Sequence, residues 1–282
     1  MNECFLNFGI DSQTNIHSLT ALLGELLEAD CTLYNRLDGD MLHAMGQWHA
    51  PPDFNTLDIA EGHICYDVIK HNIDRPLIVR DLHKTTYAQS DPNVEKYSLK
   101  TYMGQVVKCS GISTGSLCAV FTGDFSPSSD DLKLLSILSS AIGKEEERKI
   151  AEELFIESET RYVHVFDHLI DAAFLADAKT GYIVQANRQA ERLMGMDRKE
   201  IIGLHQTFLH PPAGRKKYRE IFEKAVEKGY SKEFEAEVIR KDGTIIPVII
   251  GTSTLISGNT RLILGFFREI KDKLSGTSQK KI

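Results

Sequence analysis

The stretch GYIVQANRQAERLMG, residues 181–195, changes its hydrophobic pattern in the middle. Residues 182–184 (YIV) indicate a strand, whereas the apolar residues within 190–194 recur at helical spacing. Asn187 lies between the two patterns and suits the N-cap of a helix, because its side-chain oxygen can accept a backbone N–H of the first turn. Gly195 suits the end of that helix, since glycine readily adopts the left-handed conformation. The stretch therefore predicts a sharp corner between a strand and a helix.

Further elements are predicted on both sides of this corner. The tripeptides KDG (241–243) and SGN (257–259) are strong hairpin signals between long runs of β-type residues. The elements expected here are strands at 172–178, 182–186, 230–240, 244–256 and 260–270, with short helical pieces after the corner and a longer helix at 215–229. Two strands, helices and then three strands indicate an antiparallel sheet with one face covered by helices.

The first half of the chain gives a second series of elements. They are a helix (15–30), two strands joined by the turn Asp38-Gly39-Asp40 (31–37 and 41–48), a helix (63–72), a strand (76–82) and a hairpin (within 104–122). A two-residue turn at Ser113-Thr114 in the last hairpin would place Cys109 and Cys118 directly across from each other as a redox pair. A register slip of one residue would separate them.

Residues 128–169 read as one long helix between the two halves. Its polar middle, GKEEERK, is consistent with a solvated helix. Leu135, Ile142 and Ile156 also keep a seven-residue register, interrupted by Lys149, that is typical of a parallel two-helix seam between subunits. The second interpretation predicts a homodimer through this helix. The solvated helix and the intersubunit seam both remain open interpretations.

Length and composition limit the class of protein. A chain of 282 residues favours two domains, and 42% hydrophobic with 26% charged residues is typical of a soluble globular protein. The net charge of -7 argues against direct nucleic-acid binding, which needs a basic surface. No apolar run approaches the roughly 20 residues of a membrane helix, and the N-terminus lacks the features of a signal peptide. We therefore expect a cytoplasmic protein without membrane contact.

The second half resembles a PAS domain over residues 163–272. The resemblance is carried by the corner at Asn187, the stretch MGMDRKEIIG (194–203), the Asp-Gly hairpin and the terminal FFREIKD. The first half resembles a GAF domain in the stretches EGHICYDVI, RPLIVRDL, YMGQVVKCSG and GSLCAVF. Tandem GAF and PAS domains with helical linkers are typical of the input half of bacterial and archaeal sensor histidine kinases, which belong to two-component systems.

The resemblance implies an α+β fold with two domains, each a central antiparallel sheet with flanking helices and an interior cavity. The expected parts are a GAF-like domain (1–143), a connecting signalling helix (128–162), a PAS-like domain (163–272) and a flexible tail (273–282). Cofactor occupancy varies across both families, so each cofactor must be tested on the residues present.

Two photochemical cofactors are argued against by the cysteines. Cysteinyl-flavin chemistry needs a cysteine in the PAS half, but none follows Cys118, and a bilin site would usually carry a Cys-His dipeptide, which does not occur. Haem in the GAF half stays open, because imidazole is a standard axial ligand. His63 and Cys65, next to the helix over the expected cavity, are the best candidate cofactor ligands. The five cysteines match neither a zinc site nor a disulfide framework, and no metal site is expected.

The chain carries no recognisable catalytic motif: it lacks a Walker loop, His-Glu-x-x-His and Gly-x-Ser-x-Gly. We therefore expect a sensory input module that detects a small ligand or a redox state and passes the change through the helix to a partner or effector domain. The alternatives are a non-catalytic dimerisation scaffold and the N-terminal fragment of a sensor histidine kinase.

Overall fold

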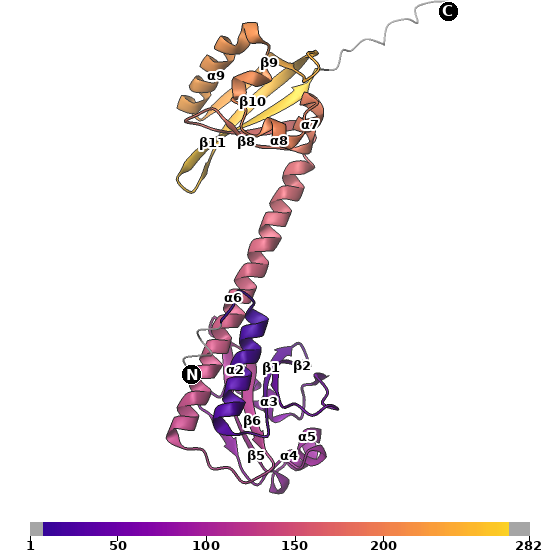
Figure 1. Ribbon diagram of the computed structural model, residues 1–282, viewed down its shortest axis with the longest axis vertical. Helices are drawn as coiled ribbons and strands as arrows, with labels where there is room; N and C mark the ends of the chain where they lie inside the picture. Colours follow the sequence, from indigo (N-terminus) through magenta and orange to yellow (C-terminus); the bar gives the residue numbers. More distant parts are fainter. Residues whose placement is uncertain (1–7, 271–282) are drawn as a thin grey trace, which may run out of the picture. The chain divides into compact units, whose positions relative to one another are not determined.

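The computed structural model describes residues 8–270, and the chain divides into two compact units, with the boundary between Ile156 and Glu157. Each unit has its own antiparallel sheet, flanking helices and core, as Figure 1 shows, which confirms the expected α+β class. The expected flexible tail (273–282) lies outside the described residues. Within the described range, no helix is both long and apolar enough to cross a membrane.

Unit 1 is built on a six-stranded sheet in the order β3-β2-β1-β6-β5-β4. Its strands are β1 (Cys31–Asp38), β2 (Met41–Trp48), β3 (Leu57–Ile59), β4 (Leu77–Val79), β5 (Thr101–Cys109) and β6 (Ile112–Phe121). The short edge strand β3 was not predicted, because three residues give no measurable alternation.

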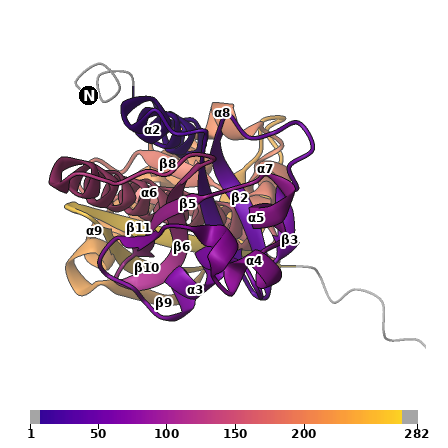
Figure 2. The same cartoon turned by 90° about the horizontal axis from the view of Figure 1, so that it is seen from below.

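Helices cover both faces of the unit-1 sheet (Figure 2). They are α2 (Ser12–Leu27), α3 (Ile64–Lys70), η1 (Leu82–Lys84), α4 (Tyr87–Ser90) and α5 (Pro92–Lys96), followed by the long helix α6 (Ser129–Asp167). One core forms where α2 and the first half of α6 meet the sheet, through residues such as Leu23, Met103 and Leu117. A second core forms on the other face around α3, through residues such as Val68 and Tyr102.

The first half of α6 is packed tightly onto unit 1. A Cβ atom at Gly143 would lie 2.2 Å from the backbone oxygen of Lys108, so only glycine permits this approach. Leu135 and Ile142 are fully buried in the core of their own unit, whereas Ile156 is exposed. The predicted intersubunit seam is therefore wrong at Leu135 and Ile142, because their side chains are already used by the protomer's own sheet.

Unit 2 is built on a five-stranded sheet in the order β8-β7-β11-β10-β9. Its elements are β7 (Ala172–Asp177), β8 (Ile183–Ala186), α7 (Arg188–Met194), α8 (Arg198–Ile201), η2 (Gln206–Leu209), η3 (Pro212–Gly214), α9 (Arg215–Lys228), β9 (Tyr230–Ile239), β10 (Ile245–Ser257) and β11 (Thr260–Glu269). Strands and helices share one core, in which Phe174 and Phe267 meet edge to face.

The corner between β8 and α7 is held by one fully buried side chain, that of Asn187. Its Oδ1 accepts the backbone N–H groups of Ala190, in the first turn of α7, and of Ala173, in β7, each at 2.9 Å. Its Nδ2 donates to the carbonyl oxygens of Phe166 at 3.2 Å and Asp171 at 3.0 Å. Asn187 therefore caps α7 and also ties the end of α6 to the sheet.

Gly195 ends α7 in the left-handed conformation, with φ 63°. Its N–H donates to the carbonyl of Glu191 at 2.8 Å, which closes the last turn of this short helix.

Candidate functional site

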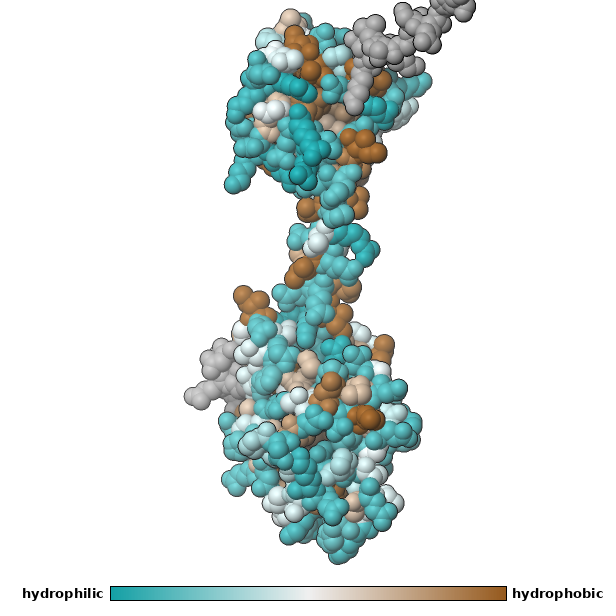
Figure 3. Space-filling model, turned by 90° about the vertical axis from the view of Figure 1, so that its right-hand side faces the viewer, coloured by the Kyte–Doolittle hydropathy of each residue, from teal (hydrophilic) through white to brown (hydrophobic). Residues whose placement is uncertain are grey.

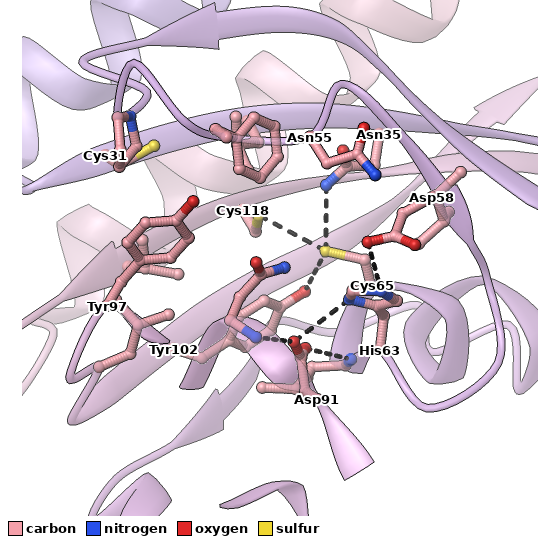
Figure 4. Close-up of a pocket in the computed structure, with 18 of the residues that line it drawn as sticks. Cys31, Asn35, Asn55, Asp58, His63, Cys65, Asp91, Tyr97, Tyr102 and Cys118 are labelled. Atoms are coloured by element: carbon pink, nitrogen blue, oxygen red, sulfur yellow. Dashed lines mark hydrogen bonds and ion pairs between the residues drawn. The ribbon is translucent and has the colours of Figure 1, made fainter. Parts of the chain in front are cut away.

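A cavity of about 230 Å³ lies in unit 1, beside the sheet face that carries α3. Figure 4 shows residues from β1, β3, α3, β5, β6 and the loops between them converging on it. Apolar side chains form much of its wall, among them Leu33, Leu42, Phe54, Ile64, Leu99 and Val120. Asn55 and Thr56 line the cavity and are exposed, so it opens to solvent beside them. An apolar cavity with a few convergent polar groups is the usual form of a small-molecule site.

Two carboxylates hold His63 at one end of this cavity. His63 Nδ1 lies 3.2 Å from Asp91 Oδ1, and His63 Nε2 lies 3.6 Å from Asp58 Oδ2. Asp91 is buried and also accepts the backbone N–H of Ile64 at 3.1 Å, which fixes it against the start of α3. The imidazole is therefore held on both ring nitrogens.

The charge state of His63 follows from these neighbours. Burial lowers the pKa of His63, but the hydrogen bond to Asp91 and its charge outweigh burial, with smaller contributions from Cys65 and Asp58, so that the pKa is raised above 6.5. An axial haem ligand needs a ring nitrogen with a free lone pair. Because both nitrogens of His63 face carboxylates, this arrangement does not fit haem ligation by His63.

We expect the titration of His63 to report this pairing directly. Asp91→Asn removes the facing charge and should lower the pKa of His63, measured by NMR of the ring protons, whereas Asp58→Asn should lower it less. Because the folded pKa is raised, the contribution of His63 to stability is complete below about pH 6.5 and is lost as the pH rises through the folded value. A wild-type pKa below 6.5, or one unchanged by Asp91→Asn, would contradict the assignment.

A second polar group in the cavity is a pair of buried thiols. Cys65 Sγ and Cys118 Sγ lie 3.6 Å apart, although 53 positions separate them in the sequence. Asn35 Nδ2 donates to Cys65 Sγ at 3.3 Å, and Tyr102 Oη lies 3.5 Å from the same sulfur. Hydrogen bonding with Cys118, Tyr102 and Asn35 lowers the pKa of Cys65 against the opposing effect of burial.

The predicted pairing of Cys109 with Cys118 is wrong. The turn of the β5–β6 hairpin lies at Ser110-Gly111, so that Cys109 faces Ile112 and Cys118 faces Gly104. Both turn residues have positive φ, 50° and 82°, as a two-residue hairpin with a matching twist requires. Threonine, which is β-branched, adopts such a φ poorly, which is why Ser113-Thr114 does not form the turn.

The remaining described thiols are less acidic than a free cysteine. Burial, aided by the nearby Asp30, raises the pKa of Cys31 to about 12. Burial also raises the pKa of Cys109. Cys118 has its pKa raised first by its hydrogen bond to Cys65 and then by burial. Cys65 is therefore the most readily ionised of the four described thiols.

The sequence analysis named His63 and Cys65 as candidate cofactor ligands, and the structure places both in the lining of this cavity. It missed their partners Asp91, Tyr102 and Asn35. Asp91 carried a signal, because an aspartate before a proline is a typical N-cap, and Asp91 does cap α5. Nothing in the sequence pattern marked the other two. Within the described residues, no group of three or more His, Cys, Asp and Glu side chains is placed to hold a metal ion.

Unit 2 contains a smaller cavity of about 50 Å³, bordered by His210 and Tyr218 among mostly apolar residues. The His210 ring stacks on Tyr218 at 3.6 Å, and its Nδ1 donates to the Glu237 carbonyl at 2.6 Å. Burial lowers the pKa of His210 to about 4. His210 is thus a neutral core residue that connects η2 to β9.

Comparison with known proteins assigns part of the chain. Residues 170–272 match the sequence model of a PAS domain. A methyl sulfide methyltransferase-associated sensor of Methanosarcina acetivorans is 23% identical over 202 residues, which are 70% of this chain and 20% of that protein. An uncharacterized protein of Azorhizobium caulinodans is 30% identical over 116 residues, which are 39% of this chain and 16% of that protein. The chain therefore spans a fifth or less of these relatives.

One solved structure resembles most of the chain. The crystal structure of the E. coli DhaR(N)–DhaL complex aligns with a TM-score of 0.53 and 13% identity, covering 92% of this chain and 87% of the matched chain. At this identity the likeness is one of fold alone. The match to the family model defines the type of domain in the second half of the chain. Residues 170–272 are a PAS domain, as expected from the corner at Asn187.

Proposed function

We propose that this protein is a sensory input module, in which the cavity of unit 1 receives a small ligand or a redox signal and α6 passes the change to a partner or effector. In this proposal residues 1–143 are a GAF-like sensory domain, 128–162 the signalling helix and 163–272 the PAS-like domain. The match of residues 170–272 to a PAS domain and the sensor from M. acetivorans support it.

The observation that carries the proposal is the alternation of side chains along β5 and β6. Tyr102 and Cys118 face the cavity, whereas their neighbours Met103 and Leu117 belong to the core beneath α6. Successive residues of a strand point to opposite faces, so a movement at the cavity is transmitted directly to the α6 side of the same strands. Transmission then needs two arrangements that differ in ligand affinity.

The partner in this proposal includes a second copy of the chain. Leu154, Phe155, Ile156, Tyr162, Val163 and Val165 are large apolar residues exposed on α6. Figure 3 shows apolar residues interrupting the polar surface of this stretch. Phe155 and Tyr162 are seven residues apart. Ser158 and Val165, each three residues further along the helix, have the same spacing, and this pattern favours a short parallel two-helix seam.

Native mass spectrometry of the full chain tests the proposal. We expect a dimer that retains a small molecule, and we expect hydrogen exchange in α6 to change when that molecule is removed. Val120→Phe should reduce its retention at least tenfold, because Val120 lines the cavity, whereas Val184→Phe on the exposed side of β8 should not. A monomer without a bound molecule, whose α6 exchange is the same in wild type and Val120→Phe, would favour a scaffold without a sensory cavity.

A further inference from the structure

The two thiols at the base of the cavity are placed to react with each other. Cys65 lies in the first turn of α3 and Cys118 lies in the second half of β6, and their sulfurs are 3.6 Å apart. Disulfide formation requires an approach to about 2.05 Å, a movement of roughly 1.5 Å that a side-chain rotation and a small shift of a short helix can supply. Both residues are buried, at 8% and 2% exposure, but both line a cavity that opens to solvent.

The surroundings distinguish the two sulfurs from each other. Cys65 Sγ has three groups within hydrogen-bond distance: the Asn35 amide, the Tyr102 hydroxyl and the Cys118 thiol. Tyr102 Oη is itself placed by Ser116 Oγ at 3.3 Å. When Cys65 is a thiolate, these groups can all donate to it, whereas Cys118 keeps its proton. The site therefore has one attacking sulfur and one resolving sulfur.

We propose that Cys65 and Cys118 are a reactive dithiol that a small hydroperoxide entering the cavity oxidises to a disulfide. This inference deepens the proposed function by naming its signal, and only its regulatory consequence rests on that function. The chemistry itself depends on the cavity, the sulfur–sulfur distance and the donors around Cys65.

The reaction balances in two steps. The Cys65 thiolate attacks one oxygen of the hydroperoxide, the O–O bond breaks, and the alkoxide or hydroxide leaves with a proton as an alcohol or water. Cys65 is then a sulfenic acid. Cys118 gives up its proton and attacks the Cys65 sulfur, the S–S bond forms, the S–O bond breaks, and the oxygen leaves as water. Two thiols are oxidised by two electrons in total, and one hydroperoxide is reduced.

Treatment of the reduced full chain with hydrogen peroxide tests this proposal. The chain has five cysteines, so denatured wild-type protein should fall from five titratable thiols to three, with a loss of two mass units and a tryptic Cys65–Cys118 cross-link. The cross-link should raise the melting temperature of unit 1 by ~5 °C or more, because it closes a long loop. Dithiothreitol should reverse all three changes.

Three cysteine variants locate the reaction. Cys109→Ser is the matched control, because Cys109 lies across from Ile112, and it should lose two thiols like the wild type. Cys65→Ser should lose none. Cys118→Ser should stop at a Cys65 sulfenic acid, trapped by dimedone. Tyr102→Phe removes one donor and should slow the reaction several-fold without changing its product. Trp48 fluorescence checks that each variant is folded.

The results separate this proposal from the proposed function. Oxidation of Cys65→Ser at the wild-type rate, or no cross-link in folded wild-type protein, would overturn the dithiol assignment and leave ligand sensing intact. A disulfide that forms as described while hydrogen exchange in α6 stays unchanged would support the chemistry and contradict its role in signalling.

Discussion

Replacement of Asn187 by alanine should destabilise the PAS domain by roughly 3–5 kcal/mol. The change removes the cap of α7, worth about 1 kcal/mol, and leaves several backbone groups without a partner, at about 1–3 kcal/mol for each that stays buried. Asn187→Asp should be nearly as damaging, because its second oxygen would face the carbonyls of Phe166 and Asp171. At an ordinary N-cap, aspartate and asparagine are equivalent.

Hydrogen exchange measured by mass spectrometry resolves this effect within the full chain. A loss of about 4 kcal/mol corresponds to roughly a thousandfold loss of protection in β7 and α7. Asn259→Ala, at an exposed asparagine in the β10–β11 turn, is the control and should leave protection unchanged. If Asn187→Asp behaved like the wild type, Asn187 would be a simple cap and not a clamp on the end of α6.

Replacement of Glu146 by alanine should destabilise unit 1 by about 2–4 kcal/mol. Glu146 is a buried carboxylate on α6 that accepts hydrogen bonds from Tyr34 Oη and from Arg36 Nη1, both at 3.0 Å. Burial and the Glu146 charge raise the pKa of Tyr34, so its hydroxyl stays protonated and donates. Removal of one partner from a buried ion pair costs about 3–5 kcal/mol. We expect a smaller loss of stability for Glu146→Ala, because the Arg36 side chain is one-third exposed and its charge stays partly solvated.

Trp48 is the only tryptophan of the chain and lies in unit 1, so its fluorescence during urea unfolding reports this change selectively. Glu146→Gln keeps an acceptor for Tyr34 and should lose about half as much stability as Glu146→Ala. Glu152→Ala, at an exposed position of the same helix, should change it by less than about 0.5 kcal/mol. Equal urea midpoints of unfolding for Glu146→Ala and Glu152→Ala would show that the hydrogen bonds of Glu146 to Tyr34 and Arg36 do not hold α6 to unit 1.

The hydrogen bonds of Asn187 and Glu146 show which contacts a sequence pattern can predict. The N-cap role of Asn187 could be predicted, but its bonds to the end of α6 could not. The N-cap is a contact within three residues, so spacing predicts it. The bonds from Asn187 to Phe166 and Asp171 join segments 21 and 16 positions away, and they depend on where the sheet of unit 2 brings the end of α6. Glu146 was likewise one acid among several in a polar run, because its partners on β1 are more than 100 positions away.

The hairpin of β5 and β6 shows the same limit at short range. The turn lies at Ser110-Gly111, whereas a turn at Ser113-Thr114, as predicted from the sequence, would shift the register and bring Cys109 opposite Cys118. Register depends on the φ that each turn residue can adopt, and small errors there move every cross-strand neighbour.

The α+β class, the PAS-type corner and most of the order of strands and helices could be predicted from the sequence, but the edge strand β3 and the short helices α4 and α5 could not. The sequence also singled out His63 and Cys65 beside a predicted helix. Periodicity and turn chemistry are local, and they act over a few residues. Only the tertiary structure decided that Cys65 meets Cys118 and that Asp91 holds His63. These contacts follow from strand order, with β6 between β1 and β5, and from the packing of α3 on that face, which no local pattern encodes.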